Sequence, residues 1–169
     1  MIQNNMYKTA KETFGKLVYD AYRAAAAAGE LPEAELAQPA VEVPRDLQNG
    51  DLSSTFALTA AKALHQAPKK IAETILSHMP ENELFDSYFA AGPGFLNAKF
   101  SNEWYRSVIA SAEAGGERYG QDDIGGGKRV MVEFVSANPT GPMHLGNARG
   151  GVIGDTIASV LDRAGYKAW

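Results

Sequence analysis

The residues with the clearest capacity for chemistry lie in one short segment, positions 137–147, which combines prolines, glycines, polar side chains and a histidine. In chain order they are Ala137, Asn138, Pro139, Thr140, Gly141, Pro142, Met143, His144, Leu145, Gly146 and Asn147. His144 can donate a hydrogen bond to phosphate oxygens as charge develops in a transition state. Asn147 adds a hydrogen-bond donor without adding a titrating group. The segment therefore predicts a loop that binds a phosphate-bearing ligand.

The remaining residues of the segment suit the same kind of ligand. Gly146 has no side chain, so an adenine or ribose ring could lie directly on its backbone. Pro139 and Pro142 stiffen the loop, which lowers the conformational entropy lost on binding. Neither the GxGxxG spacing of dinucleotide-binding loops nor the Walker spacing is present.

The elements around the segment must form a strand, a loop, a helix and a second strand. Residues 129–135, RVMVEFV, are rich in β-branched and aromatic residues and predict a buried strand. A helix is expected from near His144 to Ala164, and residues 166–169 begin the next strand. This order is typical of the first crossover of a parallel α/β sheet, where ligands bind beyond the carboxyl end of the strand. The helix N-terminus there offers unpaired N–H groups to phosphate. The apolar stripe of this helix comprises Val152, Ile153, Ile157, Val160 and Leu161.

Residues 1–115 predict a separate α+β domain. We expect helices over 7–28, from a cap at Ser53 or Ser54 to Gln66, over 69–78, and over 102–114. Strands are expected at 41–43 and on both sides of a Gly-Pro-Gly turn between 88 and 100. The inward-facing residues of the first three helices are Phe14, Leu17, Val18, Ala21 and Tyr22, then Phe56, Ala60, Ala63 and Leu64, then Ile71, Ile75 and Met79.

A glycine-rich stretch separates the two parts of the chain. Residues 115–127 contain six glycines in thirteen positions, which does not suit a regular core element. The charge also changes there, from 11 − 17 = −6 over residues 1–127 to 5 − 3 = +2 over residues 128–169. We therefore expect an accessory domain at 1–115, a linker at 116–128, and the start of a nucleotide-binding domain at 129–169.

The composition excludes several classes of protein. The chain has 169 residues and no cysteine, so disulfide frameworks, thiol nucleophiles and thiolate metal sites are excluded. Its three histidines are far apart in sequence, and we expect no metal site. No apolar run approaches the roughly 20 residues that span a bilayer, and the N-terminus lacks a signal peptide's apolar core. A net charge of −4 argues against indiscriminate nucleic-acid binding. A cytoplasmic location and no membrane partner are expected.

Two sets of residues resemble a known family. His144-Leu145-Gly146-Asn147, preceded by residues 137–142, resembles the "HIGH" signature of class I aminoacyl-tRNA synthetases. The longer run 132–166 resembles the arginyl-tRNA synthetases specifically. Upstream, residues 50–52 (GDL), 67–68 (AP) and 91–97 (AGPGFLN) resemble the N-terminal domain of that family. The resemblance implies an α+β accessory domain followed by the first βα unit of a Rossmann-like class I catalytic domain.

The same resemblance implies arginine–tRNA ligase activity. The carboxylate of L-arginine would attack the α-phosphate of ATP, and the aminoacyl group would pass to the arginine tRNA. Glu133 and Asn138 would contact the guanidinium or α-ammonium of arginine, with Ser136 alongside. A carboxylate such as Glu133 can accept two parallel hydrogen bonds from a guanidinium. His144 and Asn147 would be the catalytic pair. The residues expected to bind ATP are Pro142, His144, Gly146 and Asn147.

The resemblance also implies partners and limits. ATP is expected as a substrate with Mg²⁺, and no tightly bound cofactor is expected. The N-terminal domain would reach the D-loop corner of the tRNA. The parent enzyme would be monomeric. The signature's second histidine is replaced by Asn147. The family's lysine-rich "KMSKS" loop is absent from these 169 residues, so we expect this chain alone not to aminoacylate tRNA.

Alternative interpretations remain at this stage. The chain could be a smaller class I nucleotidyltransferase related to pantothenate synthetase, or a free-standing RNA-binding or regulatory module that uses residues 1–115. Glu133 could pair with Arg149 or Arg163, and Asp155 could be an ordinary surface or pairing residue. His65 and His78 suit helix C-termini. Two further groups could contact RNA or be structural: the basic residues Lys8, Lys11, Lys16, Arg23, Lys69 and Lys70, and the aromatic residues Tyr88, Phe89, Phe95 and Phe100.

Overall fold

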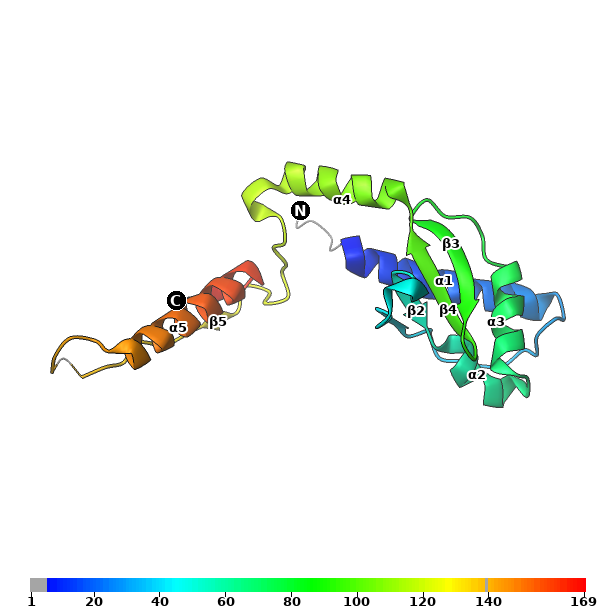
Figure 1. Ribbon diagram of the computed structural model, residues 1–169, viewed down its shortest axis with the longest axis horizontal. Coiled ribbons are helices and arrows are strands. Elements are labelled where there is room, and N and C mark those ends of the chain that lie inside the picture. Colours follow the sequence, from blue (N-terminus) through cyan, green and yellow to red (C-terminus); the bar gives the residue numbers. More distant parts are fainter. Residues whose placement is uncertain (1–5, 139) are drawn as a thin grey trace. The chain divides into compact units, whose positions relative to one another are not determined.

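The computed structural model describes residues 6–138 and 140–169, and it divides into two compact units, residues 6–110 and residues 111–169 (Figure 1). The division falls within helix α4 (Asn102–Gly115). The units are referred to below as the N-terminal unit and the C-terminal unit. The domain boundaries expected from the sequence remain a prediction.

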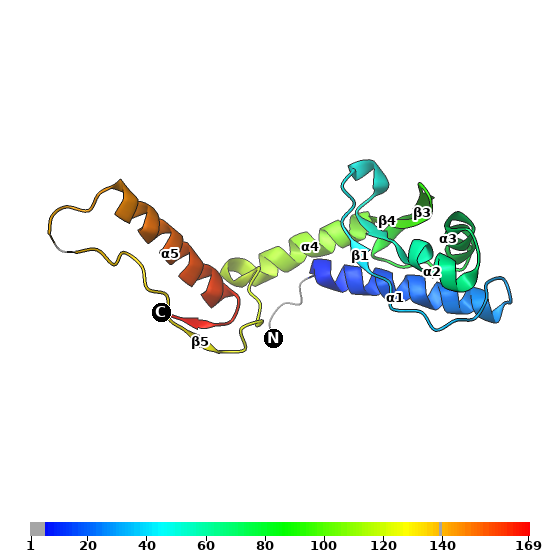
Figure 2. The same cartoon turned by 90° about the horizontal axis from the view of Figure 1, so that it is seen from below.

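The N-terminal unit is a four-stranded antiparallel sheet with three helices packed on it. The strand order is β1-β2-β4-β3, and α1 lies against the sheet in both ribbon views (Figures 1 and 2). Its elements in chain order are α1 (Met6–Ala27), β1 (Val41–Glu42), the 3₁₀ turn η1 (Leu47–Asn49), β2 (Leu52–Ser54), α2 (Phe56–Leu64), α3 (Pro68–Ser77), β3 (Phe85–Ala91) and β4 (Phe95–Phe100).

The core of this unit lies between the helices and one face of the sheet. Helix α1 buries the stripe expected from its periodicity, except that Leu17 is only partly buried. The sheet contributes Leu52, Leu96, Ala98 and Phe100 to the same cluster. The expected helices and the two strands around the Gly-Pro-Gly turn are confirmed, and His65 and His78 do end helices.

Two details of the second helix differ from the expectation. Ser53 and Ser54 belong to β2 rather than capping α2, although Ser54 Oγ still accepts a hydrogen bond from the N–H of Phe56 at 3.3 Å. The expected inner residue Ala63 is exposed, and Ala57 is buried instead. Residues 57, 60 and 64 are three or four positions apart and therefore lie on one face of α2, whereas position 63 lies beside that face.

The C-terminal unit contains a parallel strand pair joined through a helix. It comprises the end of α4, the 3₁₀ turn η2 (Gly116–Arg118), β5 (Arg129–Val130), α5 (Leu145–Arg163) and β6 (Lys167–Ala168). β5 and β6 pair in parallel, Arg129 with Lys167 and Val130 with Ala168. Figure 2 shows β5 and the C-terminus beside α5. This is the strand–loop–helix–strand order expected from the sequence.

The strand expected over 129–135 is wrong in length. Only Arg129 and Val130 form β5, and residues 131–138 have no regular structure. Pairing with the other strand continues only to Val132, whose N–H donates to the carbonyl of Trp169 at 2.9 Å. Met131 is 69% exposed, so the segment is not buried as expected. Beyond Val132 the backbone has no neighbouring strand in the described part of the chain, and an unpaired strand is not stable.

The glycine-rich stretch is attached to the end of α5. The N–H groups of Asp122, Gly125 and Gly127 donate to carbonyls of residues 163–165 at 2.8–2.9 Å. A Cβ on Gly125 would lie 2.5 Å from the ring of Tyr166, so only glycine allows this approach. The hydrogen bonds fix the second half of the stretch against the turn that follows α5.

Candidate functional site

The helix N-terminus at α5 is the centre of the candidate site. His144 is the N-cap residue, with extended backbone angles (φ −94°, ψ 172°). Its Nδ1 accepts a hydrogen bond from the N–H of Gly146 at 3.2 Å, and the Oδ1 of Asn147 accepts one from the N–H of His144 at 3.3 Å. This reciprocal arrangement is a capping box, in which two otherwise unpaired N–H groups are satisfied. The two signature side chains are thus brought together by the helix they begin.

Gly146 makes room for the imidazole of His144. A Cβ at position 146 would lie 3.1 Å from both Cε1 and Nδ1 of His144, closer than most side-chain contacts. The ring of His144 therefore occupies the space over this glycine, where the sequence suggested that an adenine or ribose ring could lie. His144 and Gly146 are exposed, and Asn147 is half-buried.

Two glycines of α5 hold the preceding segment against the helix. A Cβ on Gly154 would lie 2.2 Å from Cβ and Cγ of Phe134, and one on Gly151 would lie 3.0 Å from Cγ2 of Val135. Among the described residues of α5, Gly154 is the one that is buried. The spacing of three positions puts both glycines on one face of the helix. This contact, which the sequence analysis missed, positions residues 134–135 and so the start of the loop.

Val135 has an unusual backbone conformation for its residue type. Its φ is +57°, in the left-handed region that β-branched residues rarely adopt. Such a conformation costs about 1–3 kcal/mol and persists only where surrounding contacts impose it. Its close approach to Gly151 is the contact described at this residue, just before Ser136 and Asn138.

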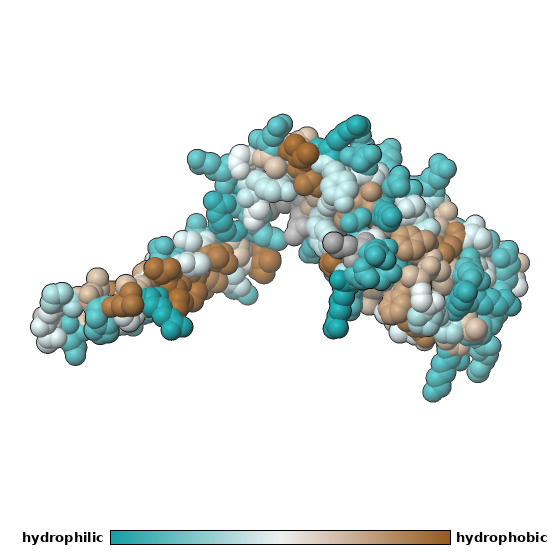
Figure 3. Space-filling view, in the orientation of Figure 1, coloured by the Kyte–Doolittle hydropathy of each residue, from teal (hydrophilic) through white to brown (hydrophobic). Residues whose placement is uncertain are grey.

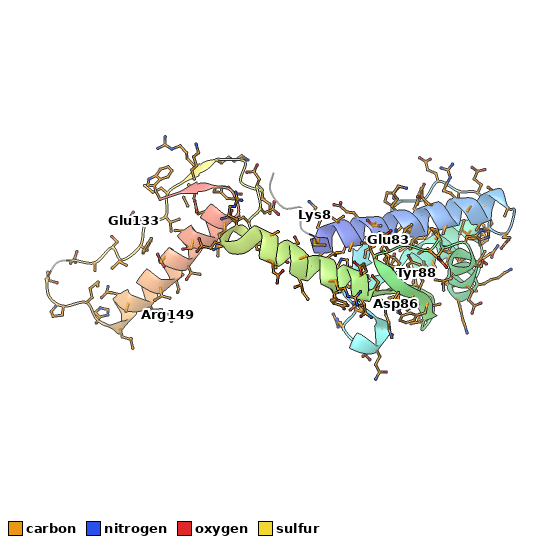
Figure 4. The ribbon with its side chains drawn as sticks, turned by 90° about the horizontal axis from the view of Figure 1, so that it is seen from above. Lys8, Glu83, Asp86, Tyr88, Glu133 and Arg149 are labelled. Atoms are coloured by element: carbon orange, nitrogen blue, oxygen red, sulfur yellow. The ribbon has the colours of Figure 1, made fainter. Side chains whose placement is uncertain are left out.

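The residues expected to bind arginine are exposed. Glu133, Ser136 and Asn138 lie on the irregular segment before the loop, and none has a described side-chain hydrogen bond. Glu133 lies on this irregular segment and Arg149 lies on α5 (Figure 4), and no ion pair of either is found among the described residues. Arg163 donates instead to the carbonyl of Glu117 at 3.1 Å. The carboxylate of Glu133 is therefore open to an external cation.

The rest of the signature segment forms an exposed loop. Ala137, Thr140, Gly141, Pro142, Met143 and Leu145 are all exposed, and Pro139 lies outside the described residues. Within 6–138 and 140–169, no group of three or more potential metal-ligating side chains is close enough to hold a metal ion. The described residues therefore supply no metal centre of their own.

The apolar stripe of α5 is largely exposed. Figure 3 shows hydrophobic residues gathered along this helix, where Val152 is 68% exposed and Val160 is 61% exposed. Ile153 and Ile157 are 48% and 46% exposed. The stripe predicted from the sequence is therefore present, but it is not covered within the described residues.

The N-terminal unit carries a second candidate surface, the face of the sheet opposite the core. Phe95, Asn97 and Lys99 alternate along β4 with the core residues, so they point to this face. Phe89 stands directly opposite Asn97 on β3. Lys99 is exposed, and its Nζ lies 6.0 Å from the centre of the Phe89 ring. We call Phe89, Phe95 and Lys99 the outer face; Asn97, on the same side of the sheet, is buried beneath its neighbours.

The four aromatic residues considered for RNA stacking divide into two groups. Phe100 belongs to the core, and Tyr88 packs against it, with its ring 6.2 Å from that of Phe14. Burial raises the pKa of Tyr88 to about 12. Phe89 and Phe95 are half-buried and lie outside the core cluster, so only these two are placed to meet a ligand.

Asp51 joins the end of β4 to the start of α4. Its Oδ2 accepts the N–H of Phe100 at 2.8 Å, and its Oδ1 accepts the hydroxyl of Tyr105 at 3.4 Å. Burial and the Asp51 carboxylate raise the pKa of both Tyr7 and Tyr105. Nothing in residues 50–52 alone indicated this role, because the partners are about fifty positions away.

Comparison with known proteins identifies both parts of the chain. Residues 11–100 match the family model described as the arginyl-tRNA synthetase N-terminal domain. Residues 108–169 match that described as the class I tRNA synthetase (R) catalytic domain.

No helix in the described part of the chain is long and apolar enough to cross a membrane.

Relatives in sequence and structure agree with these matches. The chain is 45% identical over 163 residues to an arginine–tRNA ligase of Acetivibrio thermocellus, covering 96% of this chain and 29% of the relative. It is 47% identical over 139 residues to that of Ruminiclostridium cellulolyticum, covering 82% and 25%. The arginyl-tRNA synthetase structure from Plasmodium falciparum has a similar fold, with a TM-score of 0.63, 20% identity, and coverage of 94% and 29%.

The chain thus spans less than a third of the length of these relatives. The matches favour the synthetase interpretation over a free-standing module of residues 1–115, because they continue through residue 169. They equally favour it over a pantothenate synthetase relative, because residues 11–100 match the arginyl-tRNA synthetase N-terminal domain. On the strength of two consecutive family matches, this chain belongs to the arginyl-tRNA synthetase family.

Proposed function

We propose that the protein containing this chain is an arginine–tRNA ligase. It would join L-arginine to ATP with release of pyrophosphate, and then transfer the aminoacyl group to the terminal ribose of the arginine tRNA. The observation that carries the proposal is the exposed N-terminus of α5, capped by His144 and Asn147 and placed after a parallel strand. The positive end of the helix dipole at such a terminus favours the phosphate groups of a nucleotide.

Pro142, His144, Gly146 and Asn147 would bind ATP, with His144 and Asn147 facing its phosphates and ribose. The first two α5 residues, Leu145 and Gly146, are exposed, so an anion can approach the helix end. The α-phosphate gains negative charge as the arginine carboxylate attacks it, and hydrogen-bond donors stabilise that charge. Mg²⁺ would accompany ATP, and the described residues offer no cluster of three or more metal-ligating side chains.

The arginine substrate would be bound by Glu133, Asn138 and Ser136. The exposed Glu133 carboxylate has no described ion pair, which supports bidentate binding of a guanidinium. The Rossmann-like character of the domain, the monomeric state and the cytoplasmic location also stay predictions.

ATP titration of the 169-residue chain, followed by ¹H–¹⁵N NMR, tests the nucleotide assignment. We expect saturable shifts of the Gly146 and Asn147 amides and weaker binding in His144→Ala. The matched control is His65→Asn, since His65 has φ +51° at the end of α2 and asparagine tolerates that conformation. Unchanged amides at millimolar ATP would contradict the assignment. Pyrophosphate exchange by this chain alone is expected to be absent, and clear turnover would overturn that prediction.

We also propose that the outer face contacts the tRNA. Half-buried aromatic rings suit stacking with unpaired bases, and Lys99 can neutralise a phosphate. Filter binding of arginine tRNA to the 169-residue chain should weaken in Lys99→Ala. The slope of the logarithm of the binding constant against the logarithm of the salt concentration should fall by about one in magnitude. Lys62→Ala, at an exposed position of α2, is the matched control. Equal losses in both variants would argue against a specific contact at this face.

A further inference from the structure

The hydrogen bonds at the start of α5 determine which nitrogen of His144 carries its proton. Nδ1 accepts the N–H of Gly146 at 3.2 Å, so in the neutral ring Nδ1 is unprotonated. The proton must then lie on Nε2. The two ring nitrogens flank Cε1 and point in widely divergent directions, so a ring whose Nδ1 faces the helix backbone directs its Nε2–H away from it.

Asn147 holds the backbone of His144 in the position that this arrangement needs. Its Oδ1 accepts the His144 N–H at 3.3 Å, and the N–H groups of Asn147 and Ala148 donate back to the His144 carbonyl at 2.9 and 3.2 Å. Both backbone polar groups of His144 are therefore fixed. An amide oxygen accepts hydrogen bonds at any pH, whereas a histidine at position 147 would do so only through an unprotonated nitrogen.

We propose that Asn147 is a positioning residue: with Gly146 it locks His144 as the Nε2–H tautomer, so that His144 presents a single outward hydrogen-bond donor to an ATP phosphate. This inference rests on the proposed function and changes the role of Asn147 in it. The asparagine acts through His144 rather than by touching the nucleotide. Gly146 contributes its N–H and the absence of a Cβ, which would otherwise lie 3.1 Å from the ring.

Long-range ¹H–¹⁵N correlation spectra of the histidine side chains test the proposal on the 169-residue chain without nucleotide. The three histidines can be assigned individually, and His65 and His78 serve as internal controls in the same sample. We expect the Nε2–H form of neutral His144 to predominate. Asn147→Ala should lower the ratio of Nε2–H to Nδ1–H forms about fivefold, the ratio that a net hydrogen bond of about 1 kcal/mol supports. Asn147→Asp keeps an acceptor and should retain the ratio.

The outcomes distinguish the positioning role of Asn147 from the proposed nucleotide site at His144. An unchanged tautomer ratio in Asn147→Ala, or a mixture of tautomers in the unmodified chain, would overturn the positioning role. If the ratio behaves as expected but ATP leaves the His144 ring signals unmoved, the proposed nucleotide site fails while the tautomer lock stands. If ATP moves the ring signals equally in the unmodified chain and in Asn147→Ala, with equal affinity, Asn147 does not position His144 for the nucleotide.

Discussion

Asn97 provides the sharpest test of how the N-terminal unit is stabilised. It is 1% exposed, and neither Nδ2 nor Oδ1 has a hydrogen-bond partner among the described residues. Ser53 on β2 and Phe89 on β3 stand opposite it in the sheet. A buried polar group without a partner loses its hydration and gains nothing in exchange. We therefore expect Asn97→Leu to stabilise the protein.

The size of the effect follows from three contributions. Removing two buried unpaired polar groups recovers about 1–3 kcal/mol each at most. The larger leucine side chain strains a packed site, which subtracts about 1–3 kcal/mol. Burying its methyl groups adds a contribution of about 1.5–3 kcal/mol at full burial. In the middle of these ranges the two favourable contributions exceed the strain, so we expect a net gain of at least about 1 kcal/mol, and each kcal/mol raises Tm by about 4–8 °C in a domain of this size.

Urea unfolding in a Trp169→Phe background provides the assay. The chain has two tryptophans, so Trp104, which is buried in the N-terminal unit, then becomes the sole fluorescent reporter. Ser54→Ala is the matched control, because Ser54 is equally buried at 1% but its Oγ accepts the N–H of Phe56. Its loss should cost about 0.5–1.5 kcal/mol. The two buried polar residues should thus give changes of opposite sign.

A lower midpoint for Asn97→Leu would refute the reasoning. It would mean that the amide of Asn97 has a partner, such as an ordered water molecule, whose hydrogen bonds are worth more than the buried methyl groups. Asn97→Ala separates the two cases further. If the amide is unpaired, alanine should cost little, whereas a paired amide would make alanine clearly destabilising.

Three further predictions concern other parts of the chain. Gly154→Ala should destabilise the C-terminal unit by about 1–3 kcal/mol, because the new Cβ would lie 2.2 Å from Phe134. Gly150→Ala, with no atom within 4 Å of its Cβ, should be neutral or stabilising. Unfolding of the two variants is compared by Trp169 fluorescence in a Trp104→Phe background. Asp51→Ala should lower the urea midpoint reported by Trp104, since a charged hydrogen bond is worth about 1.5–3 kcal/mol. Tyr88, whose pKa burial raises to about 12, should ionise last in an absorbance titration, with that component lost in Tyr88→Phe. Because its proton is held more tightly in the folded state, its contribution to stability is complete below about pH 10 and is lost between about pH 10 and 12.

The helices could be predicted because their signals are local. In α1 the apolar residues recur every three or four positions, and most of the predicted stripe is buried. The turn at residues 92–94 was equally predictable, because glycine readily adopts positive φ. Gly92 and Gly94 both have positive φ there. The start of α2 was not, because a serine near a helix start looks the same whether it caps the helix or ends a strand.

The strand over 131–135 could not be corrected from the sequence. Its composition favours a strand, but a strand also needs neighbours for its backbone groups. Pairing reaches only Val132, and Val135 then adopts a left-handed conformation against Gly151. Composition describes which residues tolerate a strand, whereas the length of a strand depends on its neighbours.

The location of the candidate site was predictable, and its internal contacts were only partly so. The position of His144 at a helix start followed from the strand, loop and helix pattern. The capping box was visible in principle, because His144 and Asn147 have its characteristic spacing of three positions. It was missed because serine or threonine with glutamate is the usual pair. The only feature of the sequence that could have indicated the packing of Phe134 on Gly154 is the pair of glycines three positions apart in the helix, Gly151 and Gly154.

The apolar stripe of α5 shows what periodicity does and does not establish. The spacing of Val152, Ile153, Ile157 and Val160 is that of a helix packed on a sheet, and yet all four are at least 46% exposed. Periodicity records the surroundings for which a helix is suited, while burial depends on the residues that surround it. The described C-terminal unit is instead held by the backbone hydrogen bonds of residues 122–128 and by Phe134 on Gly154. Its helix N-terminus can therefore be well formed by its own capping box even where the apolar face of the same helix is uncovered.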